Sequence, residues 1–155
     1  MWPKAQKEVR IELTLLDRLV NDYQHLIELV RNAEPDMIER SALAAFLHSF
    51  YTGIENIFKR IALEINGSVP AGDRAHSDLL EQMTRPSPNR APVISREVAD
   101  RLAGYMRFRH FFRHAYTYLL EWRRMSDLVL NAEETLRQLE SELQTFFGSA
   151  GQRPG

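Results

Sequence analysis

The sequence of 155 residues contains no cysteine. Disulfide bonds, thiolate zinc sites and cysteine nucleophiles are therefore excluded. The sequence also lacks an apolar run near the roughly 18–20 residues that a membrane span requires, and its first ten residues lack the apolar core of a secretory signal. It has no charge excess, because 20 Lys+Arg and 21 Asp+Glu give a net charge of −1. We therefore expect a cytoplasmic protein that neither contacts membranes nor coats nucleic acid over its whole surface.

The composition is that of an ordinary globular chain, with 44% apolar and 26% charged residues. The length fits one domain, since domains most often have about 100–150 residues. Four of the seven prolines lie between residues 70 and 92. We therefore predict a single helical domain over residues 1–147 with a loop-rich insertion at about 66–94, and a disordered tail at 148–155.

Apolar residues recur at steps of three and four along most of the chain, which is typical of amphipathic helices. The pattern predicts helices over about 9–30, 35–65 and 95–112, a short one near 76–83, and a last one from near 119–122 to Gly148. Gly67 should end the second helix and Ser95 should cap a later one. Gly53 lies inside a helix, which predicts a close approach of another helix. The expected fold is all-α, an antiparallel bundle of four to five helices.

The segment 101–124 differs from the rest of the chain, because it contains six arginines, one acidic residue, seven aromatic residues and two histidines. Arginine binds phosphate through a planar fork, and aromatic rings stack on unpaired bases. This mixture favours single-stranded RNA as a ligand. The alternative is that Phe108, Phe111 and Phe112 belong to the core, which their helical spacing favours.

Arg109 and His114 are the candidate reactive pair, yet at about 100° per residue they lie about 140° apart on a straight helix. We therefore expect either that the helix ends or distorts around 112–115, or that a second chain completes the site.

The string Arg109-x4-His114-x-Tyr116 resembles the R-x4-H-x-Y motif of HepT-like toxins of the HEPN superfamily. Blocks at 51–62, 76–83 and 108–116 also resemble one HepT-like subgroup, and the likeness spans roughly residues 8–130. The resemblance implies a HEPN-type bundle and a metal-independent endoribonuclease that forms a homodimer. It also implies a minimal nucleotidyltransferase antitoxin as partner, which transfers AMP to the motif tyrosine, here Tyr116.

The residues suit this chemistry, because RNA carries its own nucleophile, the 2′-OH. His114 would act as acid and base, and Arg109 would stabilise the phosphate. His110 and Arg113 are candidates for a second proton carrier and a second clamp. Glu55 and Lys59 resemble part of an E-x3-K-R motif of some HEPN groups, although an i,i+4 ion pair explains their spacing more simply.

The remaining histidines are more simply explained by structural roles than by catalysis. His76 follows Asp73 at the start of a short helix, where a cap or surface role is expected. His25 and His48 stand alone in helical patterns. No H-E-x2-H motif is present, and we expect no metal site and no cofactor.

Two other functions fit the sequence. The first is a non-catalytic HEPN module that binds RNA or a partner protein. The second is a coiled-coil-like adaptor that uses Leu136, Leu139, Leu143 and Phe146, although this repeat covers only about two heptads.

Overall fold

The computed structural model describes residues 1–116 and 119–150, and within them it is helical without a β-strand. The helices are α1 (Pro3–Leu29), α2 (Met37–Ile61), α3 (Ala75–Met83), α4 (Arg96–Phe112), α5 (Trp122–Leu130) and α6 (Ala132–Ala150). A π-helical turn, η1 (Ala62–Asn66), extends α2. The predicted all-α bundle is confirmed. None of these helices is long and apolar enough to cross a membrane.

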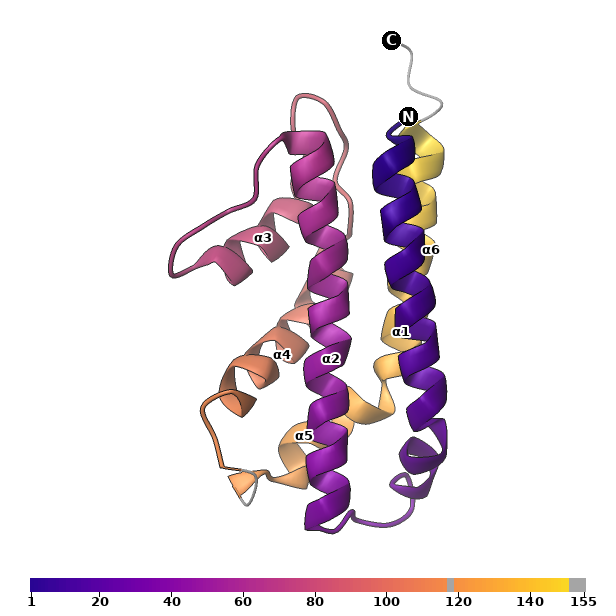
Figure 1. Ribbon diagram of the computed structural model, residues 1–155, viewed down its shortest axis with the longest axis vertical. Coiled ribbons are helices and arrows are strands. Elements are labelled where there is room, and N and C mark those ends of the chain that lie inside the picture. Colours follow the sequence, from indigo (N-terminus) through magenta and orange to yellow (C-terminus); the bar gives the residue numbers. More distant parts are fainter. Residues whose placement is uncertain (117–118, 151–155) are drawn as a thin grey trace.

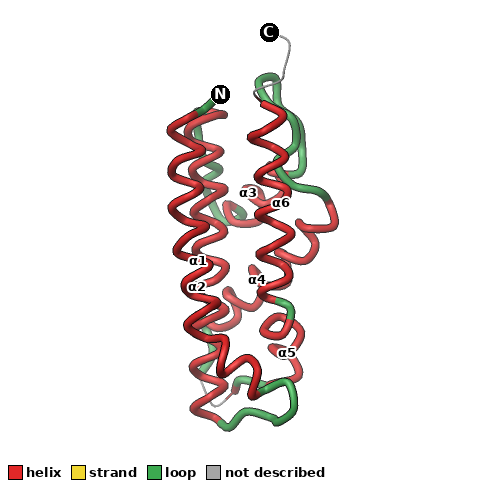
Figure 2. The backbone as a smooth tube through the Cα atoms, turned by 90° about the vertical axis from the view of Figure 1, so that its right-hand side faces the viewer, coloured by secondary structure: helices red, strands yellow, loops and turns green. Residues whose placement is uncertain are grey.

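Helix α2 is the central element of the bundle (Figure 1). It packs on α1 along one side and on α3, α4 and α5 along others, while α6 packs on α1 and α4. Figure 2 shows α1 and α2 side by side along the length of the molecule. Twelve residues of α2 are buried, so the side chains that α2 directs toward α3 and α4 are held on a rigid support.

The start of α2 is fixed by a capping box. The side chain of Asp36 accepts a hydrogen bond from the backbone N–H of Glu39 at 2.8 Å, and the Glu39 carboxylate accepts one from the backbone N–H of Asp36 at 2.9 Å. Two of the N–H groups that a helix start leaves unpaired are thereby satisfied. The other end also matches the sequence prediction, because Gly67 takes a φ of 86° directly after η1.

Gly53 has the close-approach role that its position predicts. A Cβ atom placed there would lie 2.7 Å from Cδ2 of Leu16 on α1. Helices α1 and α2 therefore contact each other closely at this point, and a Cβ atom there would press on the buried side chain of Leu16. The predicted N-cap is also present, since Ser95 Oγ accepts from the backbone N–H of Val98 at 3.2 Å.

The single last helix predicted from the sequence is wrong. The chain forms α5 and α6 with a break at Asn131, whose side chain donates to the carbonyl of Asp127 at 2.8 Å. The carbonyl of Asn131 in turn accepts from the hydroxyl of Thr135 at 2.8 Å. Hydroxyl side chains that bond the carbonyl four residues earlier often bend helices, which fits the break at Asn131. Helix α6 also continues past the predicted end at Gly148 to Ala150; of the predicted tail, residues 151–155 lie outside the described part of the chain.

The proline-rich loop 85–92 is fixed by Arg90, which is 1% exposed. Its guanidinium donates to the carbonyl oxygens of Arg85, Ala91 and Gln82 at 2.8–3.1 Å and to the Asn66 side chain at 3.1 Å. A single buried side chain therefore ties this loop to α3 and η1. These bonds hold the loop in place.

Candidate functional site

The candidate site lies where α4 ends beside α2 and α3. Helix α4 ends at Phe112, and residues 113 and 114 form a turn. A helix end here is one of the two alternatives expected for Arg109 and His114. Arg109 lies within the helix, and its side chain is directed toward α2. The side chain of His114 follows the end and is exposed.

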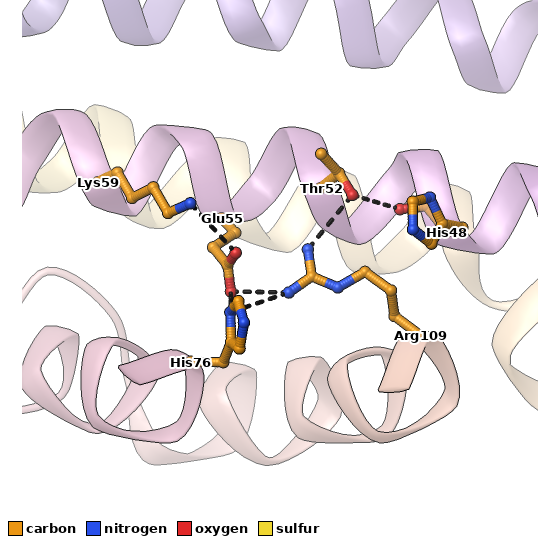
Figure 3. Close-up of polar contacts among 6 residues, drawn as sticks. All are labelled: His48, Thr52, Glu55, Lys59, His76 and Arg109. Atoms are coloured by element: carbon orange, nitrogen blue, oxygen red, sulfur yellow. Dashed lines mark hydrogen bonds and ion pairs between the residues drawn. The ribbon is translucent and has the colours of Figure 1, made fainter. Parts of the chain in front are cut away.

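Arg109 is buried, and Figure 3 shows its guanidinium in contact with Thr52 and Glu55 on α2. It is 6% exposed, and its Nη2 lies 2.9 Å from Oε2 of Glu55. Its Nη1 donates to Oγ1 of Thr52 at 3.3 Å, and its Cζ lies 4.8 Å from the centre of the Tyr51 ring. This set of contacts fixes the guanidinium in one orientation.

Glu55 connects three cationic or titratable groups. Besides Arg109, Oε2 accepts from Nδ1 of His76 at 2.7 Å, and Oε1 lies 3.6 Å from Nζ of Lys59. Burial by itself raises the pKa of Glu55, but the hydrogen bonds from His76 and Arg109 outweigh burial and lower it overall. The carboxylate is therefore ionised at neutral pH. The predicted i,i+4 contact of Glu55 and Lys59 is present, but it is only one part of a larger cluster.

Two α2 side chains next to this cluster are held neutral. Burial raises the pKa of the Tyr51 phenol, and the Glu55 carboxylate raises it further. Burial lowers the pKa of His48, and the positive charges of Arg109 and Arg113 lower it further. His48 is half-buried and lies 5.9 Å from Phe112, ring centre to ring centre.

A cavity of about 470 Å³ opens between α3 and α4 beside Arg109. Three arginines and one aspartate are among its lining residues, which are Asp73, His76, Ser77, Met106, Arg107, Arg109, His110 and Arg113. The excess of arginine makes this cavity suited to an anion such as a phosphate group.

The structure brings together some of the predicted site residues and separates others. Arg109 shares the cluster with Glu55 and the cavity with His110 and Arg113. His114 packs its ring against His110, with ring centres 5.0 Å apart, and no contact joins it to the Arg109 side chain within the described residues. Tyr116 is 69% exposed. In this single chain, Arg109 and His114 therefore face different surroundings.

Sequence reasoning missed His76. It lies 21 residues after its partner Glu55 and begins a short helix in the loop-rich insertion, where the surroundings indicate a cap. No sequence pattern pairs these two residues. Only the packing of α3 on α2 brings them together.

The aromatic residues of 101–124 divide between the core and the surface. Phe108 is buried and Phe112 packs against the core, as the helical spacing favours. Phe111 is 39% exposed and does not belong to the core. Within the described residues there is no group of three or more metal-ligating acidic or histidine side chains.

The fold and the site define an all-α bundle with an arginine-lined cavity next to a buried Arg–Glu–His cluster. The sequence model of the family described as HepT-like protein matches residues 42–150. The chain therefore belongs to the HepT-like family of HEPN-domain proteins, as the resemblance indicated. The matched range includes all residues of the cluster and the cavity. No curated protein and no solved structure matches the chain significantly.

Proposed function

We propose that this protein is a metal-independent endoribonuclease and the toxin of a cytoplasmic toxin–antitoxin pair. The cavity of about 470 Å³ beside Arg109 is the observation that supports the proposal best, because it joins three arginines to two histidines in a space suited to a phosphodiester. Membership of the HepT-like family supports the same reading.

In the proposed reaction the ribose 2′-OH attacks the neighbouring phosphorus and the 5′-oxygen leaves. A histidine titrates near neutral pH and can carry the protons that this step moves, and we assign His114 to this role. Negative charge builds on the phosphoryl oxygens in the transition state. Arg109 stabilises it from a fixed orientation, which costs no reorganisation during the reaction. His110 and Arg113, which also line the cavity, supply a second proton carrier and a second clamp.

The separation of Arg109 and His114 in one chain is the reason to propose a homodimer. A two-fold axis beside the end of α4 would place His114 of one copy near the Arg109 cavity of the other. The exposure of Phe111 and His114 fits this arrangement, since both side chains lie on the face that the partner would cover.

The decisive experiment measures RNA cleavage by purified protein in the presence of EDTA. We expect cleavage by the wild type and a loss of about 10²-fold or more in His114→Ala. His114 is exposed, so its removal leaves the fold intact, and His25→Ala on the exposed face of α1 is the matched control. Arg109→Lys keeps a charge near Glu55 but lacks the fork, and it should also be strongly impaired. Full activity of both His114→Ala and Arg109→Lys would reject this site.

We also propose that the partner is a nucleotidyltransferase antitoxin that transfers AMP to Tyr116. The exposure of Tyr116 gives an enzyme access to its hydroxyl, and a bulky anion there would compete with RNA for the nearby arginines. Mass spectrometry after incubation of both proteins with ATP should locate AMP on Tyr116 and find none in Tyr116→Phe. A label on another residue with Tyr116 unmodified would contradict this assignment.

A non-catalytic module that binds RNA or protein is the second candidate. One observation favours it: the fork of Arg109 is already occupied by Glu55 and Thr52. Under this reading the wild type binds RNA or the nucleotidyltransferase but does not cleave, and its expression without a partner is harmless to cells.

A further inference from the structure

His76 and Glu55 form a carboxylate–imidazole pair at the wall of the arginine cavity. The Nδ1 atom of His76 lies 2.7 Å from Oε2 of Glu55, and the carboxylate is 4% exposed while the imidazole is 48% exposed. The pair therefore has a buried acidic end and an accessible histidine end. The pair joins α2 to α3 through two side chains that are 21 residues apart in the sequence.

The contacts determine which ring nitrogen carries the proton. Glu55 is ionised, so Oε2 accepts and Nδ1 of His76 donates. Nη2 of Arg109 lies 3.2 Å from Nδ1, but both groups are donors that converge on the same carboxylate oxygen. Nε2 is then the nitrogen with the free lone pair. It has no protein partner within the described residues, and the ring borders the cavity.

An imidazole held through Nδ1 by a carboxylate, with Nε2 open to an anion-binding cavity, has the geometry of a general base. The carboxylate fixes the tautomer and the ring orientation, and it stabilises the imidazolium that forms. The electrostatic setting is suitable, because Arg107, Arg109 and Arg113 in the same cavity would hold the phosphate next to the acceptor nitrogen.

An in-line displacement at phosphorus needs two proton carriers on opposite sides, because the attacking and leaving oxygens are in line through the phosphorus. His110 and His114 lie together at the end of α4. His76 lies on α3, on the other wall of the cavity. The two walls thus carry separate histidines.

We infer that His76 is a catalytic base of the proposed ribonuclease and that Glu55 is its positioning residue; this inference rests on the proposed function. Nε2 of His76 takes the proton of the ribose 2′-OH as the 2′-oxygen forms its bond to phosphorus. The bond between phosphorus and the 5′-oxygen breaks, and that oxygen takes a proton from the imidazolium of His114. The products are a 2′,3′-cyclic phosphate and a 5′-hydroxyl end, so atoms and charges balance.

The test uses full-length dimer and short RNA substrates. His76→Asn should lower kcat/KM by about 10²–10⁴-fold, with the loss in kcat, and should remove the acidic limb of the pH–rate profile. Imidazole added to His76→Ala should restore part of the rate, which a purely structural role would not allow. His76 is half exposed and Glu55 keeps Arg109 and Lys59 as partners, so both variants should fold. His25→Asn is the control.

The charged and titratable groups around His76 must be considered when the pH profile is interpreted. They come from α2, from α4 and from the segment before α3, and they are Glu55, Lys59, Arg107, Arg109, His110, Arg113 and Asp73. Glu55→Gln keeps the shape of the site but removes the negative charge. It should shift the acidic limb to lower pH, because the imidazolium of His76 loses its counter-charge.

A second measurement separates this inference from the proposed function. Nitrogen-15 NMR of the histidine rings should show a protonated Nδ1 for His76 and a shift of its Nε2 signal on binding an uncleavable 2′-O-methyl oligoribonucleotide. If the wild type does not cleave RNA but this shift occurs, the proposed function fails and the placement of His76 against bound nucleic acid stands. If cleavage occurs and His76→Asn keeps a rate within about threefold of wild type, or if the Nε2 signal does not respond to the oligonucleotide, the inference is overturned.

Discussion

The buried ion pair of Glu55 and Arg109 predicts that loss of Glu55 lowers the free energy of unfolding more than loss of Arg109 does. Their side chains are 4% and 7% exposed and lie 2.9 Å apart. Removal of one partner from a buried pair typically costs about 3–5 kcal/mol, because it leaves an uncompensated charge. Glu55→Met leaves Arg109 without a carboxylate and with only neutral or titratable neighbours, the Thr52 hydroxyl, the Tyr51 ring and the His76 imidazole. We therefore expect a loss within that range in the free energy of unfolding.

Arg109→Met should cost less, about 1–3 kcal/mol, since it removes one charged hydrogen bond but leaves Glu55 with two partners. Those partners are His76 at 2.7 Å and Lys59 at 3.6 Å. The double variant removes both buried charges and replaces them with apolar side chains. It should therefore be more stable than Glu55→Met alone, and the two changes should be strongly non-additive.

Urea unfolding at pH 7, followed by circular dichroism, measures these free energies in a double-mutant cycle. The surface pair of Asp17 and Arg137 is the matched control: its atoms lie 2.7 Å apart, but its side chains are 44% and 49% exposed. The control pair should couple by less than about 1 kcal/mol. Additive effects of Glu55→Met and Arg109→Met would refute the argument that each buried charge is destabilising without its partner.

Three further perturbations test the fold and the surroundings of the site. Gly53→Ala should destabilise the protein by about 1 kcal/mol, because overpacking against Leu16 outweighs the gain in helix propensity; thermal unfolding measures this, and a stabilised variant would contradict it. Asp36→Ala removes the capping box and should cost about 1 kcal/mol in urea unfolding, whereas an unchanged midpoint would show that the cap adds nothing. His48 has a lowered pKa in the folded state, so the unfolded chain binds its proton first and stability should fall as pH drops below about 6.5. His48→Gln should reduce this loss between pH 7 and 5.5, and an identical pH dependence would exclude His48 as its source.

The sequence alone determined the helical class, because apolar steps of three and four do not depend on tertiary context. It also determined local features such as the glycine after the second helix, the Ser95 cap and the close approach of another helix at Gly53. The family resemblance, carried by the string from Arg109 to Tyr116, was likewise present in the sequence. The break at Asn131 was not found, since the apolar spacing continues across it.

The tertiary structure decided which groups face one another. Glu55 and Arg109 are 54 residues apart, and Glu55 and His76 are 21 apart, so no periodicity within one helix could pair them. The close spacing of Arg109 and His114 suggested a shared site, yet Arg109 lies on the face of α4 that packs on α2, whereas His114 lies after the helix end at the surface. Helix periodicity fixes which residues share a face of one helix, but contacts between helices depend on how those faces pack.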